Sequence, residues 1–200
     1  MNTKNLKAYA PKARREFIAA VKKRAAQFGI YEDRIEEVRI EGGAAIIEGR
    51  AFTRKEGEQR KRLESKIAER TSTTYQEKYD MFIREMAYTW FNRLAAIRYM
   101  EIHDYFDHGF RVLSPAKSNT SNPDGLPEIL SHASDVADSL ALDKSHIIEL
   151  QLAGDKEEAL YRELLLGQCH QLAKIMPQIF KGLGFEALDD ATELLLPNNL

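Results

Sequence analysis

The sequence has little of what a secreted or membrane-embedded protein needs. Its 200 residues include one cysteine, Cys169, so an internal disulfide is excluded. No run of eighteen apolar residues occurs, and the basic N-terminus is not followed by an apolar stretch. Neither a transmembrane helix nor a secretory signal is therefore predicted. A single thiol is typical of a reducing compartment, and we expect a soluble cytoplasmic protein that has no membrane partner.

Recognisable catalytic motifs are also absent from the sequence. There is no Walker A loop, no nucleophile elbow and no CxxC pair. The GxG at 182–184 follows a predicted helix and precedes an acidic stretch, which favours a helix stop with a turn over a nucleotide-binding turn. Cys169 and His170 lie among leucines, which favours a core position over a thiol nucleophile. We predict no catalytic and no cofactor-binding residue in this chain.

Four potential metal ligands fall within six residues, at His103, Asp104, Asp107 and His108. His103 and Asp107 are four residues apart and could converge on one side of a helix, whereas His108 falls on another face. Polar groups at a helix end also interact favourably with the helix dipole, and this interpretation is favoured. No metal site is predicted.

The net charge of −2 hides a strong asymmetry between the two halves of the chain. Residues 1–100 contain 22 Lys and Arg against 14 Asp and Glu, whereas residues 101–200 contain 7 against 17. A basic half can follow a phosphate backbone, because each neutralised phosphate releases condensed counterions. The acidic half is expected to face solvent, the basic half or a protein partner.

Hydrophobic periodicity predicts mainly helices in the first half. A helix over about 11–28 places Pro11 in its first turn, and a very polar helix over about 54–70 follows the capping box of Thr53 and Glu56. Gly57 weakens the prediction of the second helix. Between the two helices, alternating residues around a Gly-Gly turn predict a β-hairpin near 36–48.

A long buried helix over about 74–106 is the strongest prediction. A loop or linker rich in Ser, Asn, Pro and Gly should occupy 114–127, and shorter helices should follow at about 127–139 and 143–153, before a long helix that starts at Asp155. The predicted fold class is therefore mainly α, a helical bundle around the long central helix with a small hairpin. The expected subdomains are a basic one at 1–113 and an acidic one at 128–200, packed as one module. The apolar end of the chain suggests truncation before a longer protein continues.

Clustered basic residues are the one feature that indicates a ligand class. Such charge runs are usually solvated faces, and Glu residues dilute the second cluster by helical pairing. The clusters are nevertheless the candidates for contact with DNA phosphates. These candidates are Lys12, Arg14, Arg15, Lys22 and Lys23 in the first helix, and Arg54, Lys55, Arg60, Lys61 and Arg62 in the second.

Three segments carry a resemblance to a known family. They are MNTKNLKAYAPKARREF at the start, YTWFNRLAAIRYME at 88–101, and LYRELLLGQCHQLAKIMPQIF from 160, which is followed by DDATELLLPNNL. In this order they resemble the N-terminal region of the PglX family, the adenine-specific DNA methyltransferases of BREX phage-defence systems. The resemblance covers almost the whole chain and is weakest at about 53–72 and 114–127.

The resemblance implies a parent enzyme that transfers a methyl group from S-adenosylmethionine to the exocyclic amine of adenine in double-stranded DNA. In that family the cofactor loop and the Asn-Pro-Pro-Tyr-type tetrapeptide lie beyond the matched region. Asn122-Pro123-Asp124-Gly125 begins like the tetrapeptide but lacks the second proline and the aromatic ring, so it is interpreted as a turn. The expected role is a non-catalytic N-terminal module that assists DNA association and positions the methyltransferase domain. The alternative is a module that docks other BREX components.

Overall fold

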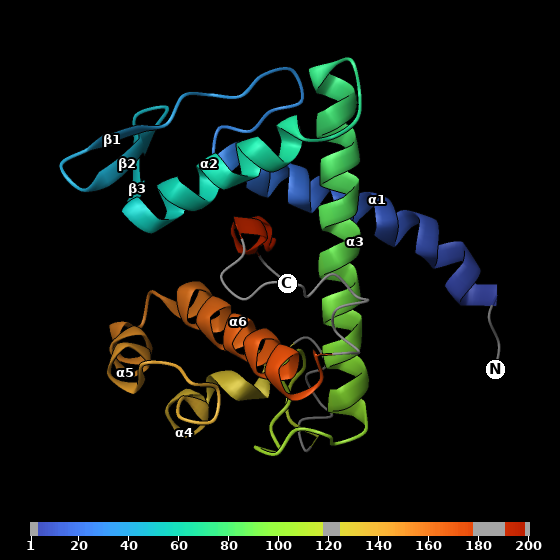
Figure 1. Cartoon of the computed structure of the whole chain (residues 1–200). Coiled ribbons are helices and arrows are strands. Elements are labelled where there is room, and N and C mark those ends of the chain that lie inside the picture. Colours follow the sequence, from blue (N-terminus) through green and yellow to red (C-terminus); the bar gives the residue numbers. More distant parts are fainter. Residues whose placement is uncertain (1–3, 118–124, 178–190, 199–200) are drawn as a thin grey trace. The chain divides into compact units, whose positions relative to one another are not determined.

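The computed structural model describes residues 4–117, 125–177 and 191–198, and the chain divides into two compact units (Figure 1). Unit 1 comprises residues 1–90 and 189–200, and unit 2 comprises residues 91–188. This division differs from the expected boundaries at 113 and 128, because a segment near the end of the chain completes unit 1. Among the described residues, no helix combines the length and the apolar character that a membrane span requires.

Unit 1 begins with helix α1, Lys4–Gln27. The predicted start at residue 11 is wrong, because the helix extends further toward the N-terminus and Pro11 lies inside it. Pro11 has a helical φ but no N–H for the carbonyl four residues earlier, so the helix lacks one hydrogen bond there. The predicted apolar stripe is confirmed, since Val21 and Ala25 are fully buried. Gly29 ends this segment at φ +66°, where a Cβ would lie 2.8 Å from a side-chain carbon of Ile47.

The predicted hairpin is present and is extended by a third strand. Strands β1 (Arg39–Glu41), β2 (Ala44–Ile47) and β3 (Arg50–Thr53) form an antiparallel sheet in that order. Helix α2, Arg54–Ala68, follows directly, and both hydrogen bonds of the capping box between Thr53 and Glu56 are present. A Cβ at Gly57 would lie 2.3 Å from the Cβ of Ala45. Glycine therefore allows the close approach of α2 to β2, which explains its place in a helix.

The long helix α3, Tyr75–Ile102, confirms the strongest sequence prediction. Its first part belongs to unit 1, where Phe82, Ile83 and Trp90 are fully buried. The hydroxyl of Thr74 accepts a hydrogen bond from the backbone N–H of Glu77 at 3.3 Å. The helix ends at Ile102 rather than near residue 106, because Asp104 takes a left-handed backbone conformation with φ +54°.

A short segment from the C-terminal end of the chain lies in the core of unit 1. The 3₁₀ turn η2, Ala191–Leu195, is buried along its whole length, and Leu194 and Leu195 belong to the same hydrophobic cluster as Val21. The indole N–H of Trp90 donates to the carbonyl of Thr192 at 3.1 Å, and the guanidinium of Arg24 donates to the carbonyl of Leu194 at 2.8 Å. Unit 1 is therefore closed by residues distant in sequence.

Unit 2 is helical among the residues that the structure describes. Instead of the predicted helix at 127–139 it has the 3₁₀ turn η1 (Glu128–Leu130) and the single-turn helix α4 (Ala133–Val136). Helices α5 (Lys144–Ala153) and α6 (Glu157–Ile175) agree with the predicted helices there. Most of the predicted turn at 122–125 and the whole predicted turn at 182–184 lie outside the described residues.

The burial of η2 predicts that this segment contributes to the free energy of unfolding of unit 1. Leu195→Ala removes a fully buried side chain and should lower the free energy of unfolding of unit 1 by about 2 to 5 kcal/mol. Urea denaturation followed by the fluorescence of Trp90, the single tryptophan, measures this change in unit 1. Met81→Ala, at a side chain that is 48% exposed in the same unit, is the control and should change stability by less than about 0.5 kcal/mol. Equal effects of the two substitutions would contradict the role of η2.

Candidate nucleic-acid interface

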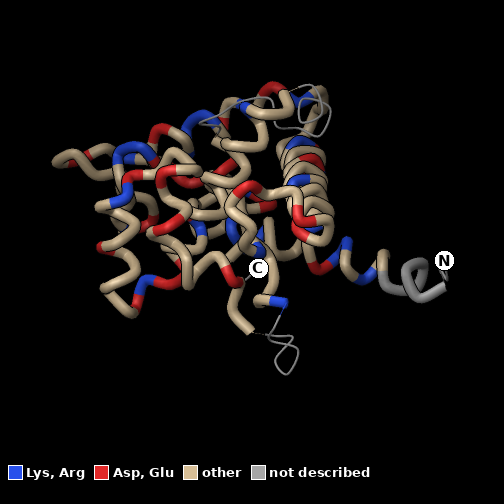
Figure 2. Tube along the Cα trace, turned by 90° about the horizontal axis from the view of Figure 1, so that it is seen from below, with Lys and Arg blue, Asp and Glu red and all other residues tan. Residues whose placement is uncertain are grey.

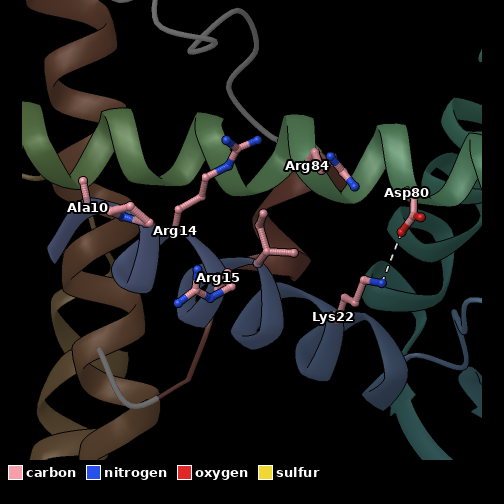
Figure 3. A pocket seen from close by; sticks show the side chains of 8 residues that line it. Ala10, Arg14, Arg15, Lys22, Asp80 and Arg84 are labelled. Atoms are coloured by element: carbon pink, nitrogen blue, oxygen red, sulfur yellow. Dashed lines mark ion pairs between the residues drawn. The ribbon is translucent and has the colours of Figure 1, made fainter. Parts of the chain in front are cut away.

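A basic groove lies between α1 and the first part of α3, within unit 1 (Figure 3). It encloses about 600 Å³. Its lining combines three apolar side chains with four positive side chains and one carboxylate. The lining residues are Ala10, Pro11, Arg14, Arg15, Ile18, Lys22, Asp80 and Arg84. We call this feature the α1–α3 groove.

Three arginines of the groove have guanidinium groups that are available to a ligand. Arg14 reaches from α1 toward α3, and its guanidinium carbon lies 5.2 Å from the ring centroid of Tyr88 (Figure 3). This contact with the ring orients the cation but does not neutralise its charge. Arg15 and Arg84 are exposed and form no ion pair among the described residues. Guanidinium groups of this kind can form paired hydrogen bonds to phosphate oxygens.

Lys22 lines the same groove, but its charge is already satisfied. Its ammonium lies 3.0 Å from a carboxylate oxygen of Glu32 and 3.1 Å from one of Asp80. Partial burial opposes protonation, but the hydrogen bonds and charges of Glu32 and Asp80 outweigh it and raise the pKa of Lys22. Lys22 is therefore a cation held by two anions, and a phosphate would have to compete with both of them.

The other candidates of the first helix lie outside the groove lining. Lys12 is exposed and forms a loose ion pair with Glu16 at 3.7 Å. Lys23 is exposed on α1. Positive and negative residues are interspersed along much of the Cα trace (Figure 2). A binding surface is therefore better identified from unpaired side chains than from the density of charge.

The candidates on α2 do not join the groove. Arg54 forms an i,i+4 ion pair with Glu58 at 3.0 Å, and Lys55, Lys61 and Arg62 are exposed on the same helix. Exposed pairs of this kind contribute little to stability and remain accessible to solvent. The structure therefore separates the two basic clusters that look alike in the sequence.

Arg60 must be removed from the candidate set. Its side chain is fully buried, and its guanidinium donates to the carbonyl oxygens of Phe28 at 2.7 Å and Glu36 at 3.0 Å. A third hydrogen bond, of 3.2 Å, joins it to the carboxylate of Glu64. Burial lowers the pKa of Arg60, although an arginine remains protonated in a protein. Arg60 ties α2 to the backbone around the end of α1, and no phosphate can reach it in this position.

Arg84 is the groove residue that sequence reasoning missed. The long helix was treated as a buried element, so its polar face was not searched for ligands. A signal was present, since Asp80, Arg84 and Tyr88 recur at intervals of four residues and therefore share one face of α3. In the structure this face forms one wall of the groove and contacts Arg14 and Lys22 from α1.

The histidines considered as metal ligands take part in ring contacts instead. His103 lies 4.4 Å from Tyr99 between ring centroids, and His108 stacks on Phe106 at 5.2 Å. The ring nitrogen Nε2 of His108 is hydrogen bonded to the side-chain amide oxygen of Gln168 at 2.9 Å. Within the described ranges no group of three or more His, Cys, Asp or Glu side chains could hold a metal ion. Cys169 is buried in α6.

The fold and the groove define a mainly helical module with a basic groove in its first unit. No family model matches the chain. It is 41% identical over its whole length to adenine-specific methyltransferase BrxX of Escherichia coli O9:H4 (strain HS). It is 31% identical over 98% of its length to adenine-specific methyltransferase PglX of Lacticaseibacillus casei (strain Zhang).

Both matches fall in the N-terminal part of these relatives, and the chain spans 16% of the length of each. The resemblance predicted from residues 1–17, 88–101 and 160–180 is thereby confirmed. The chain is similar, from end to end, to the N-terminal part of adenine-specific methyltransferases.

The burial of Arg60 predicts a structural role that is separate from ligand binding. Arg60→Met should lower the free energy of unfolding by about 3 kcal/mol, because two buried carbonyl oxygens lose their donor. Urea denaturation followed by Trp90 fluorescence measures the change. Lys61→Met removes an exposed cation from the adjacent position of the same helix and should leave stability within about 0.5 kcal/mol of the unmodified chain. A stable Arg60→Met variant would contradict this role.

Proposed function

We propose that the chain is a non-catalytic N-terminal module of an adenine-specific (N6) DNA methyltransferase of a BREX-type phage-defence system. The module assists association with double-stranded DNA and the positioning of the methyltransferase domain. Two relatives whose N-terminal parts match this chain are named adenine-specific methyltransferases, which supports the enzyme class. In this proposal, the remainder of the protein binds S-adenosylmethionine and contains the catalytic residues. The protein is expected to act in the cytoplasm.

The observation that carries the DNA role is the presence of three unneutralised arginines on one groove. Arg14, Arg15 and Arg84 come from two helices that are fixed by a shared core, so their guanidinium groups need little further ordering to meet a phosphate. Duplex DNA presents phosphates on both strands at short intervals, and each phosphate that is neutralised releases counterions. In this proposal the arginines contact phosphate oxygens, and the apolar side chains of Ala10, Pro11 and Ile18 lie next to the sugars.

Contacts of this type position DNA without reading its sequence. Recognition of a base requires side chains that reach the donors and acceptors of a groove edge, whereas guanidinium groups on phosphates see the same chemistry at every step. The module therefore supplies orientation and affinity, and the choice of the target adenine lies elsewhere in the longer protein. Lys22 contributes less, because Glu32 and Asp80 already hold its charge.

The dependence of DNA binding on salt tests this role. If Arg14 and Arg84 each contact a phosphate, the double substitution Arg14→Gln/Arg84→Gln should make the negative slope of log K against log salt concentration shallower by about 1.8, at about 0.9 per phosphate. The measurement is a fluorescence anisotropy titration of the chain with a labelled duplex at low and rising salt.

A matched control removes the same charge from another surface of unit 1. Arg39→Gln/Arg50→Gln changes two exposed arginines on β1 and β3, outside the groove lining, and should leave the slope unchanged. Equal slopes for the two double variants, or no salt-dependent binding by the unmodified chain, would reject the groove as the DNA contact.

A further inference from the structure

Three exposed aromatic rings contact one another where α3 ends in unit 2. The ring centroids of Tyr99 and His103 lie 4.4 Å apart, those of His103 and Tyr105 lie 5.5 Å apart, and those of Tyr99 and Tyr105 lie 6.3 Å apart. Tyr99 is 57% exposed, Tyr105 is 59% exposed, and the adjacent Ile102 is 52% exposed. We call Tyr99, His103 and Tyr105 the aromatic cluster.

The backbone at the end of α3 assembles this cluster before any partner arrives. Asp104 is not a glycine, yet it has φ +54°, and this left-handed turn directs the chain back so that the N–H of Tyr105 donates to the carbonyl of Met100 at 3.0 Å. The ammonium of Lys117 forms an ion pair with the carboxylate of Asp104. Tyr105 is thus held beside Tyr99 by a turn, and the ion pair between Lys117 and Asp104 stabilises that turn.

Preassembled tyrosines at a surface have the properties of a docking site. A tyrosine side chain contributes a large contact area, has few rotatable bonds to immobilise, and carries a hydroxyl that tolerates water before binding. Isolated exposed hydrophobic residues need no explanation, but three exposed rings in mutual contact form a continuous patch. Aromatic anchors of this kind account for much of the binding energy at protein interfaces.

The charges around the cluster identify the chemistry of the partner. Two nearby cations are paired, since Arg98 pairs with Glu101 and Lys117 pairs with Asp104. Arg111 donates to the hydroxyl of Ser114 and, after Lys117, helps to lower the pKa of Asp104. Asp107 is exposed and forms no ion pair among the described residues, so its carboxylate is available. Unit 2 as a whole contains nine Lys and Arg against fourteen Asp and Glu. This excess of carboxylates in unit 2 favours a cationic ligand over a phosphate.

We propose that the aromatic cluster with Asp107 is a docking site for an arginine-bearing surface of a partner protein. A guanidinium plane stacks on the tyrosine faces and its N–H groups donate to the carboxylate of Asp107. Arginine suits this surface better than lysine, because it combines a flat, weakly hydrated face with several donors. This surface is separate from the α1–α3 groove and does not rest on the proposed DNA role.

Binding of short labelled peptides to the full chain tests the proposal. The probes are a peptide of alternating arginine and serine, a matched lysine and serine peptide, and a single-stranded thymidine oligonucleotide. The arginine peptide should bind several-fold more tightly than the lysine peptide, and Tyr105→Ala should weaken it about tenfold. Asp107→Asn should weaken it about threefold. Tyr105→Phe, which keeps the ring, should bind like the unmodified chain, as should Leu152→Ala at a side chain of unit 2 that is 80% exposed.

Several results would overturn the proposal. Equal binding of both peptides, unaffected by Tyr105→Ala, would show general attraction to an acidic unit. Oligonucleotide binding that Tyr105→Ala abolishes would assign the cluster to nucleic acid instead. Self-association in sedimentation that the same substitution removes would assign it to a second copy of the chain. Absence of binding by the arginine peptide would also reject the site, provided that circular dichroism shows the variants and the unmodified chain to be equally folded.

Discussion

The packing of residues 191–197 into the core of unit 1 is the constraint on which the basic groove depends. Arg24 donates from α1 to the backbone of this segment, and Trp90 does so from α3. The two helices that form the groove walls are therefore fixed to the same short piece of chain. Arg14 and Arg84 keep their places because Val21 and Phe82, on the same two helices, are buried in one cluster with Leu194 and Leu195. A ligand site on α1 and α3 is thus built by residues at both ends of the sequence.

Basic residues that look alike in the sequence differ in burial and ion pairing in unit 1. Arg60 is buried, donates hydrogen bonds to backbone carbonyl oxygens, and holds α2 in place. Lys22 and Arg54 are paired with carboxylates. Arg14, Arg15 and Arg84 line a groove without a neutralising partner. A phosphate that meets Arg14, Arg15 or Arg84 does not require a protein ion pair to break first, whereas one that meets Lys22 or Arg54 does.

The sequence predicted those parts of the fold that depend on local pattern. Helical periodicity located α1, α3 and α6, and the capping box at Thr53 located the start of α2. The hairpin followed from its alternation and its Gly-Gly turn. The start of α1 was placed too late because Pro11 is typical of a first turn, although it lies inside this helix. The third strand and the end of α3 depended on turns with positive φ at Glu48 and Asp104, which are not glycines.

The long-range contacts of the fold could not be predicted from one sequence. The leucines at 194–196 are core residues, and their partners lie on helices more than a hundred positions away in the sequence. For the same reason, Arg84 was not identified from the sequence, and Arg60 was wrongly included among the candidates for phosphate contact. Burial and ion pairing are properties of the folded chain. The resemblance to the N-terminal part of methyltransferases could be seen without these contacts, because it is carried by contiguous segments.

The segregation of charge between the two units is the reason for proposing a different class of ligand for each unit. Unit 1 contains 20 Lys and Arg against 17 Asp and Glu, a small excess that becomes effective only because its unpaired arginines gather at one groove. Unit 2 has the opposite excess, and its exposed rings are followed in the chain by Asp107, which is exposed and forms no ion pair among the described residues. The two proposed ligands differ in charge, so the chemistry that would favour each ligand at its own surface would disfavour it at the other.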